Sequence, residues 1–197
     1  MNKIHEIFPI PVYEADLDLD IVEMERLCNE HQGQTDNRKV SNAGGFQSHI
    51  SLLNNNFKEL ITKLEYHAQI YSKTFLTKQK QCLDTLWLNV NGYKSSNISH
   101  VHPGCNISGC YYVKVPSESG SITFEHPAID VLHWYQARQD ISTSEFRRYS
   151  RLVWDFVPKE NTLYLFPSWI RHSVRANENL TEKRISIAFN FNSGVEV

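Results

Sequence analysis

From about Leu83 to the C-terminus, the sequence consists of short runs rich in β-branched and aromatic residues, each followed by turn residues. Eight such runs occur, and their regular spacing is typical of an antiparallel β-sandwich or barrel. The runs are Thr85–Asn91, Asn97–His102, Ile107–Val115, Gly120–Glu125, Arg151–Val157, Thr162–Phe166, His172–Arg175 and Arg184–Phe191. The stretch 128–150 is an insertion between two of these runs, and its pattern assigns no structure to it.

Two segments before this region carry apolar residues at helical spacing, namely Asp18–His31 and Asn55–Lys80. Between them, the glycine-containing stretch Ser41–Ser48 is expected to be a loop. Because the helices precede the strands and no strand–helix–strand alternation follows, a parallel α/β sheet is disfavoured. The sequence therefore predicts one mainly β domain, an eight-stranded jelly roll (double-stranded β-helix, cupin-like). Residues 83–197 would form its core, and residues 1–82 would supply supporting helices and the first strand.

The charge and composition of the chain argue against several classes of protein. Twenty basic and 22 acidic residues give a net charge of −2, which argues against a dedicated nucleic-acid binder. No apolar run approaches the roughly 18 residues of a membrane helix. The N-terminus carries acids and prolines where a signal peptide would need an apolar stretch, and the four cysteines form no CxxC pair. We therefore expect free thiols and a cytoplasmic location.

Three histidines are candidates for a metal site. His100 and His102 are two residues apart, so on a strand both imidazoles would point to one face. His172 lies at the start of a distant strand in the sequence FPSWIRHSV. Jelly-roll enzymes build facial metal sites from two ligands on one strand and a third on another. A histidine pair alone also occurs on ordinary polar strand faces, so the motif by itself leaves both interpretations open.

The last predicted strand has two different faces. Its alternate residues from Ile185 to Phe191 are all apolar and should pack against the helices. The opposite face begins with Arg184 and continues with small or polar residues. A buried guanidinium needs a carboxylate or phosphate partner, so this face suggests an anion site. The alternative keeps Arg184 on the surface, paired with Glu178 or Glu182.

Five sequence blocks occur in order between about Trp87 and Asn192: HVHPG, ISGCYYV, GSITFEHP, LYLFPSWIRHSV and RISIAFNF. Together they resemble the 2-oxoglutarate/Fe(II)-dependent oxygenases of the prolyl-4-hydroxylase-like superfamily, in particular small members from marine bacteria and phages. The resemblance implies Fe(II) as cofactor, 2-oxoglutarate and O₂ as co-substrates, and hydroxylation of a C–H bond with release of succinate and CO₂. It favours a peptidyl proline as primary substrate and leaves a free amino acid, a nucleobase or another small metabolite open.

The resemblance also assigns metal ligands. His100 and His172 match the two histidine ligands of the family, whereas His102 stands where an aspartate or glutamate is usual. We predict three neutral imidazoles on the iron. A site completed by water or by Glu125 is the alternative, and strand alternation is expected to turn Glu125 away from the metal.

The same resemblance assigns co-substrate contacts. Arg184 and Ser186 match a pair that binds the distal carboxylate of 2-oxoglutarate, and Tyr112 matches a tyrosine that donates to it. Additional candidates for contacts with the co-substrate are Asn89, Asn97 and Ser108.

Two other classes are weighed against this prediction. A cupin-like metalloenzyme could use three histidines without 2-oxoglutarate, but it leaves Arg184 and Ser186 unexplained. A non-enzymatic jelly-roll binding protein could carry a vestigial site. The expected partners are 2-oxoglutarate, O₂ and a peptide or small-molecule substrate; a membrane is not expected, and the net charge argues against nucleic acid.

Overall fold

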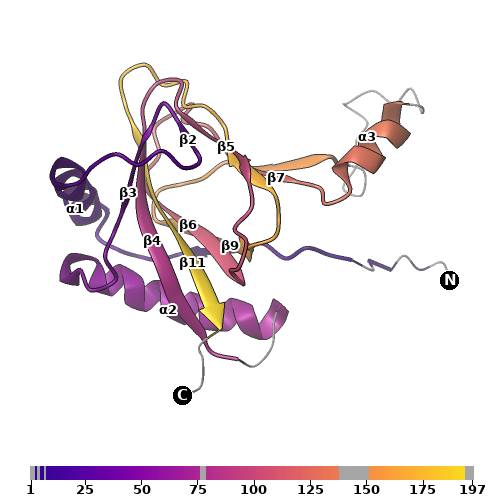
Figure 1. The fold of residues 1–197 in the computed structure, drawn as a ribbon, viewed down its shortest axis with the longest axis horizontal. Coiled ribbons are helices and arrows are strands. Elements are labelled where there is room, and N and C mark those ends of the chain that lie inside the picture. Colours follow the sequence, from indigo (N-terminus) through magenta and orange to yellow (C-terminus); the bar gives the residue numbers. More distant parts are fainter. Residues whose placement is uncertain (1–2, 4, 7, 76–78, 138–150, 194–197) are drawn as a thin grey trace.

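The computed structural model describes residues 3, 5–6, 8–75, 79–137 and 151–193, which form two antiparallel sheets (Figure 1). The six-stranded sheet has the order β1 (Tyr13–Asp16), β9 (Thr162–Pro167), β6 (Ile107–Lys114), β11 (Arg184–Ser193), β4 (Gln81–Asn91) and β3 (Phe46–His49). The five-stranded sheet has the order β2 (Asn42–Ala43), β5 (Ser96–His100), β10 (His172–Val174), β7 (Ile122–Glu125) and β8 (Val153–Phe156). All eight predicted runs form strands, so the predicted mainly β jelly roll is confirmed.

Helices α1 (Ile21–Gln34) and α2 (Lys58–Phe75) cover one face of the six-stranded sheet (Figure 1), and a short 3₁₀ turn, Asn55–Phe57, leads into α2. Asp20 caps the N-terminus of α1, because its side chain accepts hydrogen bonds from the backbone N–H groups of Val22 and Glu23. Apolar residues of both helices and of the central strands form one buried core. The predicted apolar face of β11 lies in this core, and it comprises Ile185, Ile187, Phe189 and Phe191.

The N-terminal region contributes more strands than the sequence predicts. The stretch Ser41–Ser48, expected to be a loop, contains β2 and the start of β3, joined through Gly44 at φ +79°. Strand β1 also precedes the first helix, so residues 1–82 supply three strands besides the helices and the start of β4. These strands are short, and β3 is held by pairing with Trp87–Val90 of β4. Pairing with a neighbouring strand therefore outweighs the weak β-propensity of these short segments.

The insertion between β7 and β8 contains helix α3 (Ile129–Ala137), which projects away from the two sheets (Figure 1). The rest of the predicted insertion, residues 138–150, lies outside the described residues. Within the part of the chain that the structure describes, no helix is both long enough and apolar enough to cross a bilayer.

Candidate metal centre and adjoining cavity

The fold brings the three predicted histidines together on the inner side of the five-stranded sheet. His172 of β10 lies directly opposite His100 of β5 in the antiparallel register. The imidazole centroids of His100, His102 and His172 are 4.5–5.1 Å apart. One ring nitrogen from each histidine lies within 4.8 Å of the others. Among the described residues, this is the only group of three or more potential metal ligands of these types.

The position of His102 corrects one step of the sequence argument. Strand β5 ends at His100, so His102 does not share a strand face with it. Pro103 has no backbone N–H to continue the ladder, and Gly104 takes φ +81° in the turn that follows. The backbone N–H of His102 instead donates to the carbonyl of Ser168, at 3.0 Å. This contact directs the His102 ring toward the same point by a turn instead of by strand alternation.

The backbone fixes the tautomers of two histidines. Nδ1 of His100 lies 2.6 Å from the carbonyl oxygen of Ile98, and Nδ1 of His172 lies 2.9 Å from that of Ile170. A carbonyl only accepts, so each Nδ1 carries the proton and each Nε2 keeps its lone pair for a metal. This arrangement is the one that metal-binding histidines commonly show.

Burial keeps these imidazoles neutral. Desolvation lowers the pKa of His172 to about 3, and desolvation with the nearby His100 lowers the pKa of His102 to about 4. Desolvation also lowers the pKa of His100. Neutral imidazoles are the form that binds iron, so the donor set fits an Fe(II) ion.

Glu125, the alternative ligand, is held elsewhere. Its carboxylate accepts a hydrogen bond from Ser99 Oγ, and its second oxygen lies 3.8 Å from Nε of Arg171. The metal-ligand group does not include Glu125. Among the described residues, three histidines and no carboxylate therefore lie at the point where the rings converge.

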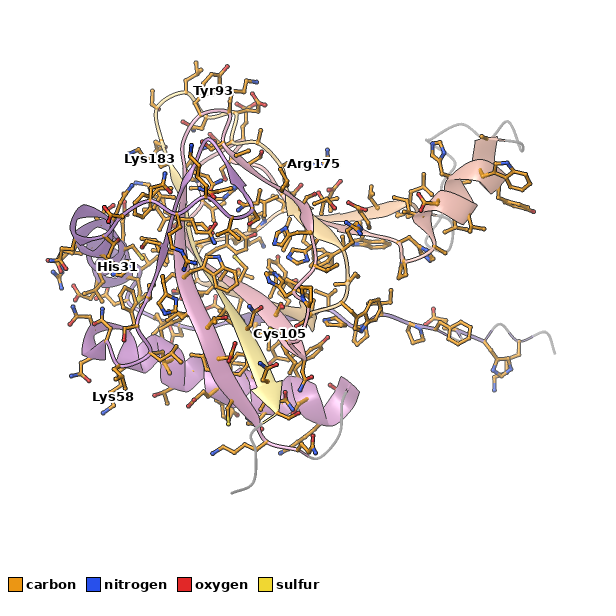
Figure 2. All side chains as sticks on the ribbon, viewed as in Figure 1. His31, Lys58, Tyr93, Cys105, Arg175 and Lys183 are labelled. Atoms are coloured by element: carbon orange, nitrogen blue, oxygen red, sulfur yellow. The ribbon has the colours of Figure 1, made fainter. Side chains whose placement is uncertain are left out.

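The three histidines open into a small cavity between the two sheets. Of the predicted co-substrate residues, Asn89, Asn97 and Ser186 line this cavity. The other lining residues are Ser41, Trp87, His100, His102, Gly109, Cys110, Ile122, Phe166, His172, Val174 and Ala188. Figure 2 shows how side chains fill the space between the sheets; Cys105 marks the turn just after His102, and Lys183 marks the residue before Arg184.

Arg184 is buried, with 1% of its surface exposed, and it has no carboxylate partner among the described residues. Its guanidinium donates to backbone carbonyls only, those of Ser119, Arg175 and Gly120. Burial lowers the pKa of Arg184 below its ordinary value, because desolvation disfavours the charged form. A buried cation without an anion is costly, so this environment favours an anionic ligand.

The alternative of a surface Arg184 is wrong. Glu178 pairs with Lys94, and Glu182 lies 3.6 Å from Lys114. Neither acid contacts Arg184 in the salt bridges of the described residues.

Two buried polar atoms on residues opposite Ser186 also lack hydrogen-bond partners. They are Tyr112 Oη and Asn89 Oδ1. Tyr112 and Asn89 lie opposite Ser186 on its two neighbouring strands, so the three side chains form one row across the inner face of the sheet. A carboxylate bound by Arg184 could accept the Tyr112 O–H and Ser186 O–H, which fits 2-oxoglutarate.

Ser108 is not part of this group. Its hydroxyl lies 2.8 Å from Ser168 Oγ and donates to Asn190 Oδ1 at 2.7 Å, and it does not line the cavity. Its hydrogen-bonding capacity is therefore used within the fold.

Comparison with protein families assigns the chain. The family model described as "Putative 2OG-Fe(II) oxygenase" matches residues 85–190, more than half of the sequence. The chain belongs to the 2OG-Fe(II) oxygenase family. It is therefore an enzyme that uses Fe(II) and 2-oxoglutarate, as the resemblance implied. No curated protein matches the sequence of this oxygenase.

Solved structures support the fold of the oxygenase. A prolyl-4-hydroxylase from Pseudomonas putida superposes with a TM-score of 0.65 at 10% identity, covering 94% of each chain. The epimerase SnoN from nogalamycin biosynthesis gives a TM-score of 0.69 at 13% identity, covering 93% of this chain and 79% of that one. HygX from Streptomyces hygroscopicus, with nickel and 2-oxoglutarate bound, gives 0.62 at 14% identity, covering 93% and 83%.

Several cavity residues of the oxygenase were missed from the sequence. Trp87 lies with its ring centroid 5.7 Å from that of His102, and Ser41 and Cys110 also line the cavity. Alternation along β4 could have placed Trp87, since it is two residues from Asn89 and therefore on the same strand face. Ser41 gave no such signal, because it precedes a strand that the sequence did not predict.

A second, larger groove lies apart from the histidines. It has a volume of about 700 Å³, and its lining includes His126, Phe124, Phe156 and Ile170. None of the residues that the structure describes lines both this groove and the cavity with the histidines. His126, the residue that directly follows β7, is part of this separate groove.

Proposed function

We propose that this oxygenase is a hydroxylase that holds Fe(II) with His100, His102 and His172 and binds 2-oxoglutarate through Arg184. One observation carries the proposal: three neutral imidazoles converge on a cavity lined by Ser186, and a buried arginine without a carboxylate partner among the described residues lies two positions before Ser186 on β11. Tyr112 and Ser186 assist Arg184 with hydroxyl donors, and Asn89 and Asn97 contribute amide groups to the cavity wall. Ser108 keeps a structural role through its two hydrogen bonds.

Bound Fe(II) supplies the activation of O₂ that couples decarboxylation of 2-oxoglutarate, to succinate and CO₂, with hydroxylation of a substrate C–H bond. The protein contributes binding and orientation. The backbone carbonyls of Ile98 and Ile170 hold the His100 and His172 rings in place. Arg184 fixes the distal carboxylate, so that the co-substrate has one orientation in the cavity. The ring of Phe166, 4.6 Å from that of His172, keeps water from one side of the site.

The primary substrate is a peptide or a small molecule. Both classes have precedents among structural neighbours, in a prolyl hydroxylase from Trichoplax adhaerens in complex with a peptide fragment and in HygX with hygromycin B bound. The four cysteines of the chain are free thiols, which supports a cytoplasmic location.

The test is an anaerobic titration with Fe(II) and 2-oxoglutarate, followed by the weak visible charge-transfer band of the Fe(II)–2-oxoglutarate complex. Wild type should form the band. His172→Ala should lose iron while circular dichroism shows an intact fold, because the outer apolar core does not involve His172. Metal binding without the band in wild type would favour the cupin-like alternative. Absence of metal binding would favour a non-enzymatic protein.

A further inference from the structure

The metal cavity contains no acidic side chain among the residues that line it. His102 occupies the place where the resemblance leads one to expect a carboxylate ligand. The closest acid in the sequence argument, Glu125, is engaged by Ser99 and Arg171 and lines the separate groove. The described residues that line the cavity are therefore uncharged, and the buried Arg184 lies two positions before one of them, Ser186, on β11.

This composition leaves one positive charge without a partner when the enzyme is loaded. Fe(II) carries two positive charges and Arg184 one, whereas 2-oxoglutarate carries two negative charges. The three imidazoles add none, because an imidazole binds a metal only in its neutral form. A carboxylate ligand would have cancelled the excess charge. An unpaired charge in a desolvated cavity is unfavourable, so the cavity will bind a further anion in preference to a neutral molecule of the same shape.

The cavity wall beside the histidines offers a hydrogen-bond donor to such an anion. Asn97 Nδ2 donates to Ser41 Oγ at 3.3 Å, and Asn97 Oδ1 accepts from Asn91 Nδ2 at 3.3 Å. The hydroxyl of Ser41, which lines the cavity with His100 and His102, is thereby oriented by an amide and keeps its own O–H as a donor. Donors in this position complement a negative group and would not repel it.

We infer that the primary substrate of this oxygenase is an anion whose negatively charged group enters the cavity beside His102 and Ser41 and balances the charge of the three-histidine centre. The inference rests on the proposed function, since it assumes Fe(II) and 2-oxoglutarate in this cavity. It names the substrate class as molecules with a carboxylate or comparable anionic group close to the C–H bond that reacts.

The test uses two probes of the same shape, propionate and propionamide, which differ in charge. Wild-type enzyme is loaded anaerobically with Fe(II) and saturating 2-oxoglutarate in chloride-free buffer, and each probe is titrated while the charge-transfer band is recorded. Propionate should shift the band and bind at least about tenfold more tightly than propionamide, because only propionate neutralises the cavity. Equal affinities would overturn the inference. Bleaching of the band by propionate would also overturn it, because bleaching reports displacement of 2-oxoglutarate from Arg184.

Two variants that are nearly identical in shape provide the control. His102→Asp adds one negative charge at the ligand position, whereas His102→Asn adds none. At saturating Fe(II), His102→Asp should lose the preference for propionate, and His102→Asn should keep it. A preference that persists in His102→Asp would overturn the charge argument even if wild type discriminates between the probes.

Failure of the inference is distinguishable from failure of the proposed function. A wild-type enzyme that forms the band and binds both probes equally contradicts only the anionic substrate. A wild-type enzyme that forms no band contradicts the assigned ligands of Fe(II) and 2-oxoglutarate, and the inference falls with them.

Discussion

The two faces of β11 differ in what surrounds them. The outer face carries Ile185, Ile187, Phe189 and Phe191, all buried against the helices. The inner face carries Arg184 and small or polar residues, and some neighbouring polar atoms have no partner. Strand β4 repeats the contrast, with alternate residues in the helix-side core and in the cavity. One face of the sheet therefore provides the stability that lets the other face keep unsatisfied groups for ligands.

The largest effect should follow from removing an aromatic ring on the outer face. Phe189→Ala should lower the free energy of unfolding by about 3–5 kcal/mol, because the site is fully buried and closely packed. A Cβ at Gly109 would already lie 2.4 Å from the Phe189 ring, which illustrates the tight packing. Urea denaturation measures the change. Iron stoichiometry of the folded variant should match wild type, and its loss would contradict the separation of the two faces.

In contrast to Phe189→Ala, Arg184→Ala should change ligand binding at the inner face. A hydrogen bond to a charged group contributes about 1.5–3 kcal/mol, so the affinity for 2-oxoglutarate should fall about 10- to 150-fold. Iron binding should persist, because the three histidines are untouched. Titration of the charge-transfer band with 2-oxoglutarate measures this change. Wild-type affinity in the variant would remove the main support for the co-substrate assignment.

The free energy of unfolding of the metal-free protein should depend on pH through the histidines of the cavity. The pKa values of His172 and His102 are lowered to about 3 and about 4, from 6.5. Between pH 6.5 and about 4 the unfolded chain binds more protons than the folded one. Stability should therefore fall as the pH falls, by up to about 1.4 kcal/mol per pH unit for each histidine. Urea denaturation at several pH values measures the slope, and His172→Asn should reduce it. An unchanged slope in the variant would contradict the assignment.

Ser186→Ala should produce the smallest change. It removes one neutral hydroxyl from the inner face and no charge, so the affinity for 2-oxoglutarate should fall about 2- to 10-fold. The same titration measures it, with Arg184→Ala as the reference. A larger loss than in Arg184→Ala would mean that the hydroxyl, not the guanidinium, dominates binding of the distal carboxylate.

The sequence predicted those parts of the molecule in which a periodic pattern coincides with a buried face. The alternation from Arg184 to Phe191 placed both faces of β11 correctly, and it directed Arg184 inward. Strand β3 was missed because it is short and follows two glycines, so only its pairing with β4 defines it. The end of β5 at His100 was missed although Pro103 was a visible signal. Ser41, which lines the cavity, was missed as well, because it lies in the stretch Ser41–Ser48 that the sequence predicted to be a loop.

The backbone contacts of His100 and His172 determine how many protons these two residues release when the metal binds. In both residues the imidazole proton is donated to a backbone carbonyl two positions earlier in the chain, so the opposite nitrogen already carries no proton. Loading of the metal at neutral pH therefore displaces no proton from these two ligands into solution. The heat of loading should consequently be the same in calorimetry buffers with different ionisation enthalpies, a behaviour that sites built on cysteine thiols cannot share.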